Sequence, residues 1–533
     1  MAPVHCLPPE ILGYIFQLIN LEQLDRRGHD GAPPLTYVSH VCERWRQIAL
    51  DMQELWARWP RYRTADENWT LLCCLRATSA PLDLNWHIGS RYLPRVRHTL
   101  PHASRARSLD IHIYMDYTPD TCAFWHDEAL PALSVPFPLL EDFSFISTEE
   151  SEDYHARHLV SSLFGGICPP RLGTIFLSFC EALQSCPIYS ASLQHLQVYN
   201  TRAWANVDDM IQLFQSIPKL ESFEYALDSP YYNKYTFDPT PSQRYPLRAV
   251  TMDRLKSFSL RESRFVPGIT IFCYLALPAN ASISFCCTRH EEVEEMDANE
   301  LTQALEHMRL GTDALKQHFA SALSQGMPYF HSIEIEAMYV RPLHHPDEED
   351  RERLPQFICL QAPLAHTRNM LIRAEPCLMT ALQPVFLRAS YIRLKWLGLR
   401  RHSHRWYSLW INMHRYLRVT QLHLHGTNAV HFVDYLRIWE RSAALSVPLF
   451  PLLKTIRLSD FDFTQKMSGW IMDAQDDERP FAVQFGDATN KIYGSSSFFT
   501  CIAVGTSCKG YEEAVEQLRL CLGEDRVQLD DEV

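Results

Sequence analysis

Apolar residues recur at helical spacing in two stretches near the start of the chain. In LPPEILGYIFQLI they run from Leu7 to Ile19, and Pro8 and Pro9 occupy the first turn, where a missing N–H costs little. In YVSHVCERWRQIALDMQELW an apolar stripe containing Val41, Cys42 and Trp45 faces a polar side, and Leu55 and Trp56 follow a short polar break. The pattern predicts two short amphipathic helices joined by the loop DRRGHDGAPP.

These helices form a small unit. About fifty residues make only a marginal core, so two apolar stripes of this size cannot bury each other completely. We therefore expect part of the apolar surface of residues 1–60 to need a partner, either another part of the chain or another protein.

A different pattern recurs further along the chain: a Leu, two variable residues, then two apolar residues separated by one that is usually polar. The clearest copies are LLEDFSF, RLGTIFL, SLQHLQV, KLESFEY, RLKSFSL and LLKTIRL, and looser copies are SLDIHI, HSIEIEA, IRLKWL and VTQLHLHG. Adjacent copies are roughly 20 to 35 residues apart. Helical stretches precede two of them, NVDDMIQLFQSIP and VHFVDYLRIWERSAALS. The pattern predicts short strands connected by helical or irregular return segments.

Alternation along each predicted strand separates inward from outward side chains. Leu196, Val198, Ile456 and Leu458 are expected to point into the core. The residues between them are expected on an exposed face: His195, Gln197, Ser222, Glu224, Ser257, Ser259, Glu334, Glu336, His423, His425, Thr455 and Arg457. We take His195, Gln197, Glu224, His423, His425 and Arg457 as candidate substrate-binding residues on the concave side of a repeat solenoid. An ordinary α/β sheet domain is the alternative, since it also alternates strands and helices.

The pattern divides the chain into three parts. Residues 1–60 are the helical unit, 61–472 the repeat-like body, and 473–533 a C-terminal capping region and tail. The sequence DAQDDERPFAVQFGDATN breaks the rhythm, and SSSFFTCIA and YEEAVEQLRLCLG then predict a strand and a closing helix.

One uncharged stretch, Gly268–Cys287, admits two interpretations. Its length is that of a membrane span, but Pro278 and Asn280 interrupt it, and each apolar half is far shorter than the roughly 20 residues a spanning helix needs. Two buried strands around a Pro-Ala-Asn turn are the favoured interpretation.

Composition limits the classes of function. With 46% apolar and 21% charged residues the chain is of the folded, globular kind, and its net charge of −13 argues against nucleic-acid or anionic-membrane binding as a main activity. The start MAPVHCLPPE carries no secretory signal, so we expect an intracellular protein, cytoplasmic or nuclear, whose sixteen cysteines are reduced.

No pattern of catalytic residues is present. The chain has no GxSxG, phosphate loop, HExxH or dinucleotide fingerprint, so we expect neither an enzyme nor a cofactor. His423 and His425 face one way on a predicted strand, but no acidic or Cys partner stands at fixed spacing, and we interpret them as surface histidines rather than metal ligands.

Arg393–Val419 interleaves basic and aromatic side chains, with Arg400, Arg401 and Arg405 close to Trp406 and Trp410. Three interpretations stay open. The aromatic residues could be core with arginine stems over them, the arginines could hold an acidic or phosphorylated peptide, or the patch could bind nucleic acid. Arg400, Arg401 and Arg405 are further candidate substrate-binding residues.

Taken together, LPPEIL with the following IF, then VCERWRQIA, then LW, resembles the F-box, and most closely the F-box-like proteins of mushroom-forming (basidiomycete) fungi. The resemblance implies docking on a Skp-family adaptor and, through it, on a cullin. The positions it assigns to the adaptor contact or its support are Leu7, Pro8, Ile11, Ile15, Val41, Cys42, Trp45, Leu55 and Trp56. The loop between the helices is longer than in the most compact F-boxes.

F-box segments commonly precede leucine-rich repeats in that family. The expected fold is therefore α/β: a small all-α F-box followed by an irregular leucine-rich-repeat solenoid, an α/β horseshoe. The expected function is a non-catalytic substrate-recognition subunit of an SCF-type cullin ubiquitin ligase, whose repeats bind a protein substrate.

The alternative function is a non-ligase interaction scaffold whose F-box-like helices only cap the repeats. A docking module would leave Leu7, Ile15 and Trp56 partly exposed, whereas a cap would bury its apolar stripe against the first repeat.

Overall fold

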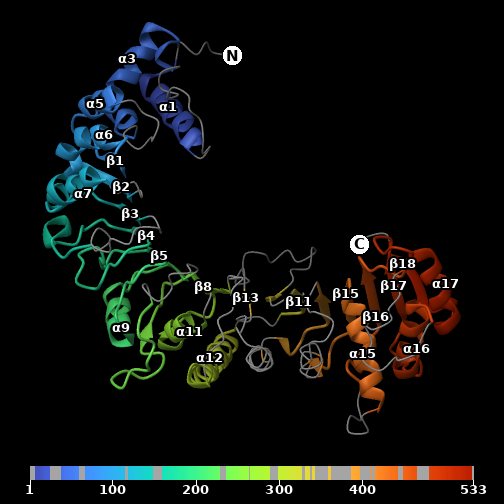
Figure 1. The fold of residues 1–533 in the computed structure, drawn as a ribbon. Helices are drawn as coiled ribbons and strands as arrows, with labels where there is room; N and C mark the ends of the chain where they lie inside the picture. The colour runs from blue at the N-terminus through green and yellow to red at the C-terminus, as the bar shows by residue number, and fades with distance from the viewer. Residues whose placement is uncertain are drawn as a thin grey trace. The chain divides into compact units, whose positions relative to one another are not determined.

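The computed structural model describes residues 7–24, 38–58, 67–113, 118–147, 159–227, 236–262, 265–287, 298–326, 330–336, 339–342, 358–361, 384, 386–395, 410, 413–414, 416–441, 448–464 and 479–530. The chain forms two compact units (Figure 1). Unit 1 comprises residues 1–245 and 252–255, and unit 2 comprises residues 246–251 and 256–533. Helix and strand are mixed in both, so the protein is of the α/β kind, with helices at its N-terminus.

Unit 1 begins with helices and continues with strands. Its helices are α1 (Pro9–Leu24), α3 (Glu43–Asp51), α4 (Gln53–Ala57), α5 (Glu67–Arg76), α6 (Leu93–Thr99), α7 (Pro119–Phe124), α8 (Leu130–Leu133) and α9 (Val207–Ser216), with short helical turns η3 (Leu100–Arg105), η4 (Trp125–Ala129) and η6 (Leu163–Gly166). Its strands are β1 (Leu82–Ile88), β2 (Ala106–Ile113), β3 (Asp142–Ser147), β4 (Thr174–Ser178), β5 (His195–Tyr199) and β6 (Ser222–Leu227).

The six strands of unit 1 form a parallel sheet in chain order, β1-β2-β3-β4-β5-β6. Helices α5, α6 and α7 lie along one side of it (Figure 1). Inward side chains of neighbouring strands stack at the same register and are buried, among them Phe145, Leu177, Val198 and Tyr225. The predicted inward direction of Leu196 and Val198 is confirmed.

A turn with the same hydrogen bonds precedes four of these strands. The N–H of Leu140, Leu172, Leu193 and Leu220 each donates to the carbonyl three residues earlier, at 3.4, 3.2, 3.0 and 3.3 Å, and each of these leucines is fully buried. The next residue donates its N–H to the corresponding turn of the preceding strand, as Gln194 does to the Gly173 carbonyl at 2.8 Å. The recurrent leucine of the sequence pattern therefore marks a turn that links neighbouring strands.

The remaining helices and strands belong to unit 2. Its helices are α11 (Phe265–Tyr274), α12 (Ala298–Ser324), α15 (Asn428–Arg441), α16 (Phe481–Tyr493) and α17 (Tyr511–Leu522), with the turn η7 (Glu524–Arg526). Its strands are β7 (Val250–Thr251), β8 (Ser257–Glu262), β9 (Leu275–Ala276), β10 (Ser282–Cys287), β11 (Ser332–Glu336), β12 (Tyr339–Pro342), β13 (Ile358–Gln361), β14 (Tyr391–Leu394), β15 (Gln421–His425), β16 (Thr455–Ser459), β17 (Cys501–Gly505) and β18 (Val527–Asp530).

Within unit 2 the strand order is β8-β10-β13-β12-β11-β14-β15-β16-β17-β18, and β7 pairs with β9 separately. All described ladders are parallel except those of β12, which is antiparallel to β11 and β13. All ten strands that the recurrent pattern predicts are present, and so are the helices expected before Lys219 and Leu452. The predicted C-terminal strand and helix are confirmed as β17 and α17, while β18 was not predicted.

The expectation of two strands in Gly268–Cys287 is wrong for its first half. Residues up to Tyr274 belong to helix α11, and the second half contains the predicted turn and strand β10. Residues 267–274 of α11 are all buried. A Cβ on Gly311 of α12 would lie 2.1 Å from Ile269 Cγ1, so the two helices need this glycine to approach. An apolar run buried all round has no polar face, so its pattern cannot distinguish helix from strand. Among the described helices, none is both long enough and apolar enough to cross a membrane.

Candidate functional site

Helix α1 has two apolar faces, not one stripe. Leu12 and Phe16 point inward and are buried, and the Phe16 ring lies 5.2 Å from the Trp45 ring of α3. Ile11, Tyr14 and Leu18 point outward, with 47%, 60% and 44% of their surfaces exposed. Their spacing of three and four residues places them on one side of the helix.

The start of α3 borders this region. Val41 is 56% exposed, and Cys42 caps the helix by accepting the Trp45 N–H on its Sγ at 3.4 Å. The Arg44 guanidinium donates to the Leu7 carbonyl at 2.7 Å, which holds the segment before α1 against α3. A Cβ on Gly13 would lie 2.9 Å from Met52 Sδ, so α1 also passes close to the end of α3.

Helix α4 has the opposite environment. Leu55 and Trp56 are buried, with 1% and 2% of their surfaces exposed. The Trp56 indole N–H donates to the Ala49 carbonyl at 2.9 Å, and its ring lies 5.8 Å from the Trp69 ring of α5. The Arg76 guanidinium, also from α5, lies 4.3 Å from the centre of the Trp56 ring. α4 therefore fastens the N-terminal helices to the rest of unit 1.

The predicted adaptor-contact residues consequently fall into three groups. Pro8, Ile11 and Val41 are exposed, Leu7, Ile15, Cys42 and Trp45 are partly buried, and Leu55 and Trp56 lie in the interior. Sequence reasoning did not single out Tyr14 and Leu18. Their spacing of three and seven residues from Ile11 places them on the same side of the helix and could have identified them. They were missed because all apolar residues of the helix were assigned to one stripe.

The candidate substrate-binding residues of unit 1 lie on the outward side of the sheet, as the alternation predicts. His195 is exposed, and Gln197 and Glu224 are partly exposed on neighbouring strands. Gln197 and Glu224 occupy the same register position, so their side chains are neighbours across β5 and β6.

In unit 2 the expectation of an exposed face is wrong for His423. Only 3% of its surface is exposed, its Nδ1 is 3.1 Å from the Tyr391 hydroxyl, and its Nε2 is 2.8 Å from Ser459 Oγ. Burial, reinforced by the positive charge of Arg393 and Arg457, lowers the pKa of His423 to about 4. The Tyr391 and Ser459 side chains of neighbouring strands lie against the imidazole, a contact that strand alternation alone does not predict.

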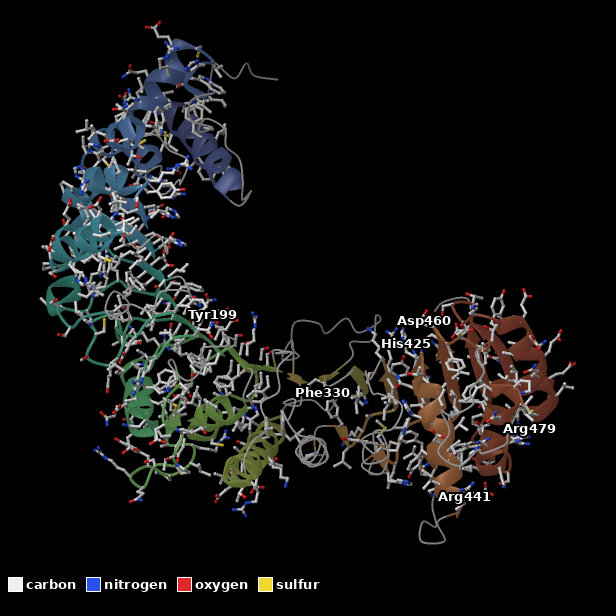
Figure 2. All side chains as sticks on the ribbon, in the orientation of Figure 1. Tyr199, Phe330, His425, Arg441, Asp460 and Arg479 are labelled. Carbon is white, nitrogen blue, oxygen red and sulfur yellow. The ribbon has the colours of Figure 1, made fainter. Side chains whose placement is uncertain are left out.

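Other candidates lie beside carboxylates. The imidazole of His425 lies 2.6 Å from the carboxylate of Asp460 (Figure 2). The Arg457 Nε lies 3.4 Å from Asp530 Oδ2 of β18. No group of three His, Cys, Asp or Glu suited to a metal occurs among the described residues.

The basic and aromatic stretch Arg393–Val419 is described only in part. Trp410 and Tyr416 are buried in the core, and the Trp410 ring lies 5.3 Å from that of Phe432 on α15. For these two aromatic residues the core interpretation holds. Arg400, Arg401 and Arg405 lie outside the described residues.

The comparisons agree with the N-terminal geometry. A family model described as F-box-like matches residues 4–59, which include α1, α3 and α4. The resemblance inferred from LPPEIL, VCERWRQIA and LW is thus confirmed for this segment. F-box domains generally bind Skp-family adaptors. No match to the chain is found among curated proteins.

Proposed function

We propose that this protein is the substrate-recognition subunit of an SCF-type cullin ubiquitin ligase, docking through residues 4–59 on a Skp-family adaptor. The observation that carries the proposal is the exposed apolar surface of Ile11, Tyr14, Leu18 and Val41 inside the F-box-like match. Exposed apolar residues gathered on one side of a helix are typical of a protein interface.

The proposal also requires the anchoring of α4. Because Trp56 is held by Ala49, Trp69 and Arg76, the docking helices are joined to unit 1 by packed side chains. A recognition subunit needs such a connection, since it acts by holding a substrate lysine near a ubiquitin-charged enzyme and raising the effective concentration of the reacting groups. In this proposal the protein performs no chemistry and acts in the cytoplasm or nucleus.

We further propose that the body is an irregular leucine-rich-repeat solenoid. Parallel strands in chain order and the repeated leucine turn support this interpretation over an ordinary α/β domain. The outward side chains of the strands, including His195, Gln197 and Glu224, would then contact the protein substrate.

One observation favours the alternative of a non-ligase scaffold. Leu55 and Trp56 are buried against unit 1, as in a cap. The two functions differ in the role of the outward side of α1. In a ligase subunit the adaptor would cover this side, whereas a scaffold would not use it for adaptor binding.

Co-expression with a Skp-family adaptor tests the proposal, and a fungal adaptor is the first choice given the sequence resemblance. We expect a stable one-to-one complex by size-exclusion chromatography with mass determination. The double variant Ile11→Asp/Leu18→Asp should lose the complex and stay folded. Leu75→Asp is the matched control, because Leu75 is an exposed apolar residue on α5, 60% accessible and outside the match. A folded chain that does not bind the adaptor would instead support the scaffold.

A further inference from the structure

The turns before strands β14, β15, β16 and β17 carry exposed apolar side chains. Leu387, Leu417, Leu452 and Phe498 have 48%, 54%, 36% and 50% of their surfaces exposed. Each of them precedes the first residue of its strand by three or four residues. We call these four residues the turn row.

Backbone hydrogen bonds hold the four turns next to one another. The N–H of Thr420 donates to the Ser390 carbonyl, that of Lys454 to the Thr420 carbonyl, and that of Thr500 to the Lys454 carbonyl, each at 2.8 Å. The turns therefore follow one another at the spacing of neighbouring strands, which is about 4.8 Å. Three such intervals give the turn row a length of about 14 Å.

The equivalent turns of unit 1 have a different surface. Their two middle positions are Pro138 and Leu139, Pro170 and Arg171, Ala191 and Ser192, and Pro218 and Lys219. Leu139 is the one large apolar residue among these eight, and it is partly buried. The turn itself therefore does not require an exposed apolar residue, and a row of them in unit 2 is typical of a binding surface.

Cationic side chains accompany the turn row. Arg418 follows Leu417, Lys454 lies two residues after Leu452, and both are exposed. No Asp or Glu occurs in the four turn segments 386–390, 416–420, 450–454 and 496–500. On a chain with a net charge of −13 these turns are a basic region, which attracts an acidic partner. Contact with the same surface of a second copy would instead bring like charges together.

The spacing of the row favours a helix in the partner. The backbone N–H groups of Thr420, Lys454 and Thr500 already bond to neighbouring turns, so recognition falls to side chains. One helical turn rises about 5.4 Å, whereas side chains on one side of an extended strand lie about 6.6 Å apart. Over three intervals of about 4.8 Å the mismatch is about 2 Å for a helix and about 5 Å for a strand.

We propose that the turn row binds an amphipathic helix of a partner protein. The apolar stripe of that helix packs on the row, and Asp or Glu side chains beside the stripe approach Arg418 and Lys454. A helix of about ten residues is long enough to cover the row. This goes beyond the proposed function and does not depend on it, because the row lies in unit 2 and the F-box-like match in unit 1.

Fluorescence polarisation with the full-length chain, without adaptor, tests the proposal. The probe is a fluorescein-labelled fourteen-residue peptide with one leucine per helical turn and glutamates on both sides of that stripe. One comparison peptide carries Lys in place of every Glu, and another has the same composition with its leucines at alternate positions. We expect the acidic striped peptide to bind at least tenfold more tightly than either, and its affinity to fall as salt is raised.

Two variants locate the site. Leu417→Ser/Leu452→Ser removes apolar surface from the middle of the row, and Arg418→Gln/Lys454→Gln removes the charge beside it. Each should weaken binding of the acidic striped peptide at least tenfold.

Each variant has a matched control. Leu520→Ser/Leu529→Ser changes two exposed leucines of α17 and β18. Arg171→Gln/Lys219→Gln changes two exposed cations in the equivalent turns of unit 1. Both controls should leave the affinity unchanged.

Equal binding of the acidic striped peptide and either comparison peptide would overturn the proposal, and so would equal losses in a row variant and its control. A dimer in analytical ultracentrifugation that Leu417→Ser/Leu452→Ser converts to a monomer would also overturn it, since a second copy would then occupy the row. Circular dichroism identifies a variant that fails to fold, and the charge variant, which changes only exposed side chains, then decides alone. Because adaptor binding is measured separately, failure of either proposal leaves the other standing.

Discussion

The F-box-like segment has apolar side chains on both α1 and α4, and they differ in burial. On α4, Leu55 and Trp56 are buried, and Trp56 packs against α5 of the same chain. On α1, Ile11, Tyr14 and Leu18 face outward. The difference shows that one short helical module both attaches to the body and leaves apolar side chains exposed, and that contact with α5 decides which helix is buried.

The largest expected effect is on the attached side. Trp56→Ala removes a ring that packs between Trp69 and Arg76, and we expect the free energy of unfolding of unit 1 to fall by about 3–5 kcal/mol. Urea denaturation followed by circular dichroism measures the loss. Trp56→Phe, which keeps most of the ring, should lose less, and an unchanged midpoint for Trp56→Ala would contradict the inward role of α4.

The outward side should respond in binding and not in stability. Tyr14→Ala removes an aromatic ring that is 60% exposed, so we expect about 2 kcal/mol of adaptor affinity to be lost. The free energy of unfolding should change by less than about 0.5 kcal/mol. Titration calorimetry with the adaptor gives the first quantity. A stability loss like that of Trp56→Ala would place Tyr14 in the core instead.

A smaller effect on stability is expected at the contact between Arg76 of α5 and Trp56 of α4. Arg76→Ala removes the guanidinium above the Trp56 ring, and a cation–π contact of this kind contributes about 0.5–2 kcal/mol. Arg76→Lys should retain part of it. The amide hydrogen-exchange rate of α4 measures the effect of Arg76→Ala. Faster exchange would show that the contact between α4 and α5 has loosened. Exchange identical to wild type would show that ring packing alone holds α4.

The smallest predicted change is an increase in stability. Cys42 caps α3 with a sulfur, a weak acceptor, whereas a serine hydroxyl is a preferred cap. Cys42→Ser should therefore stabilise unit 1 by about 0.5 kcal/mol, and Cys42→Ala should destabilise it by a similar amount. Thermal unfolding of the two variants side by side checks the order, which would be reversed if the thiol acted chiefly through apolar packing.

Sequence was most informative where one side of an element is buried. The spacing of Leu196 and Val198 predicted strand β5 and its inward face. The recurrent leucine, as at Leu193, was recognised as part of the pattern, and the structure shows that it marks a turn fixed by backbone hydrogen bonds. It was least informative where both sides of a helix are apolar. In α1 the outward residues could not be separated from the inward ones, and in α11 the lack of a polar face concealed the helix.

The candidate site was predictable as a segment but not residue by residue. The motif found the segment from Leu7 to Trp56, which lies within the F-box-like match at residues 4–59. Contact with α5, which follows the segment in the chain, buries Trp56, and the motif does not predict this. His423 shows the same limit, because its burial depends on Tyr391 and Ser459 from neighbouring strands.

The in-register rows of the unit 1 sheet have a consequence for how such a protein could change over evolutionary time. The outward side chains are regularly spaced. Each lies about 4.8 Å from its neighbours on adjacent strands and about 6.6 Å from the next outward side chain on the same strand. The fold is maintained from the opposite side, by residues such as Phe145, Leu177 and Val198. Substitution of a single outward residue can therefore change what the surface recognises while the fold stays the same.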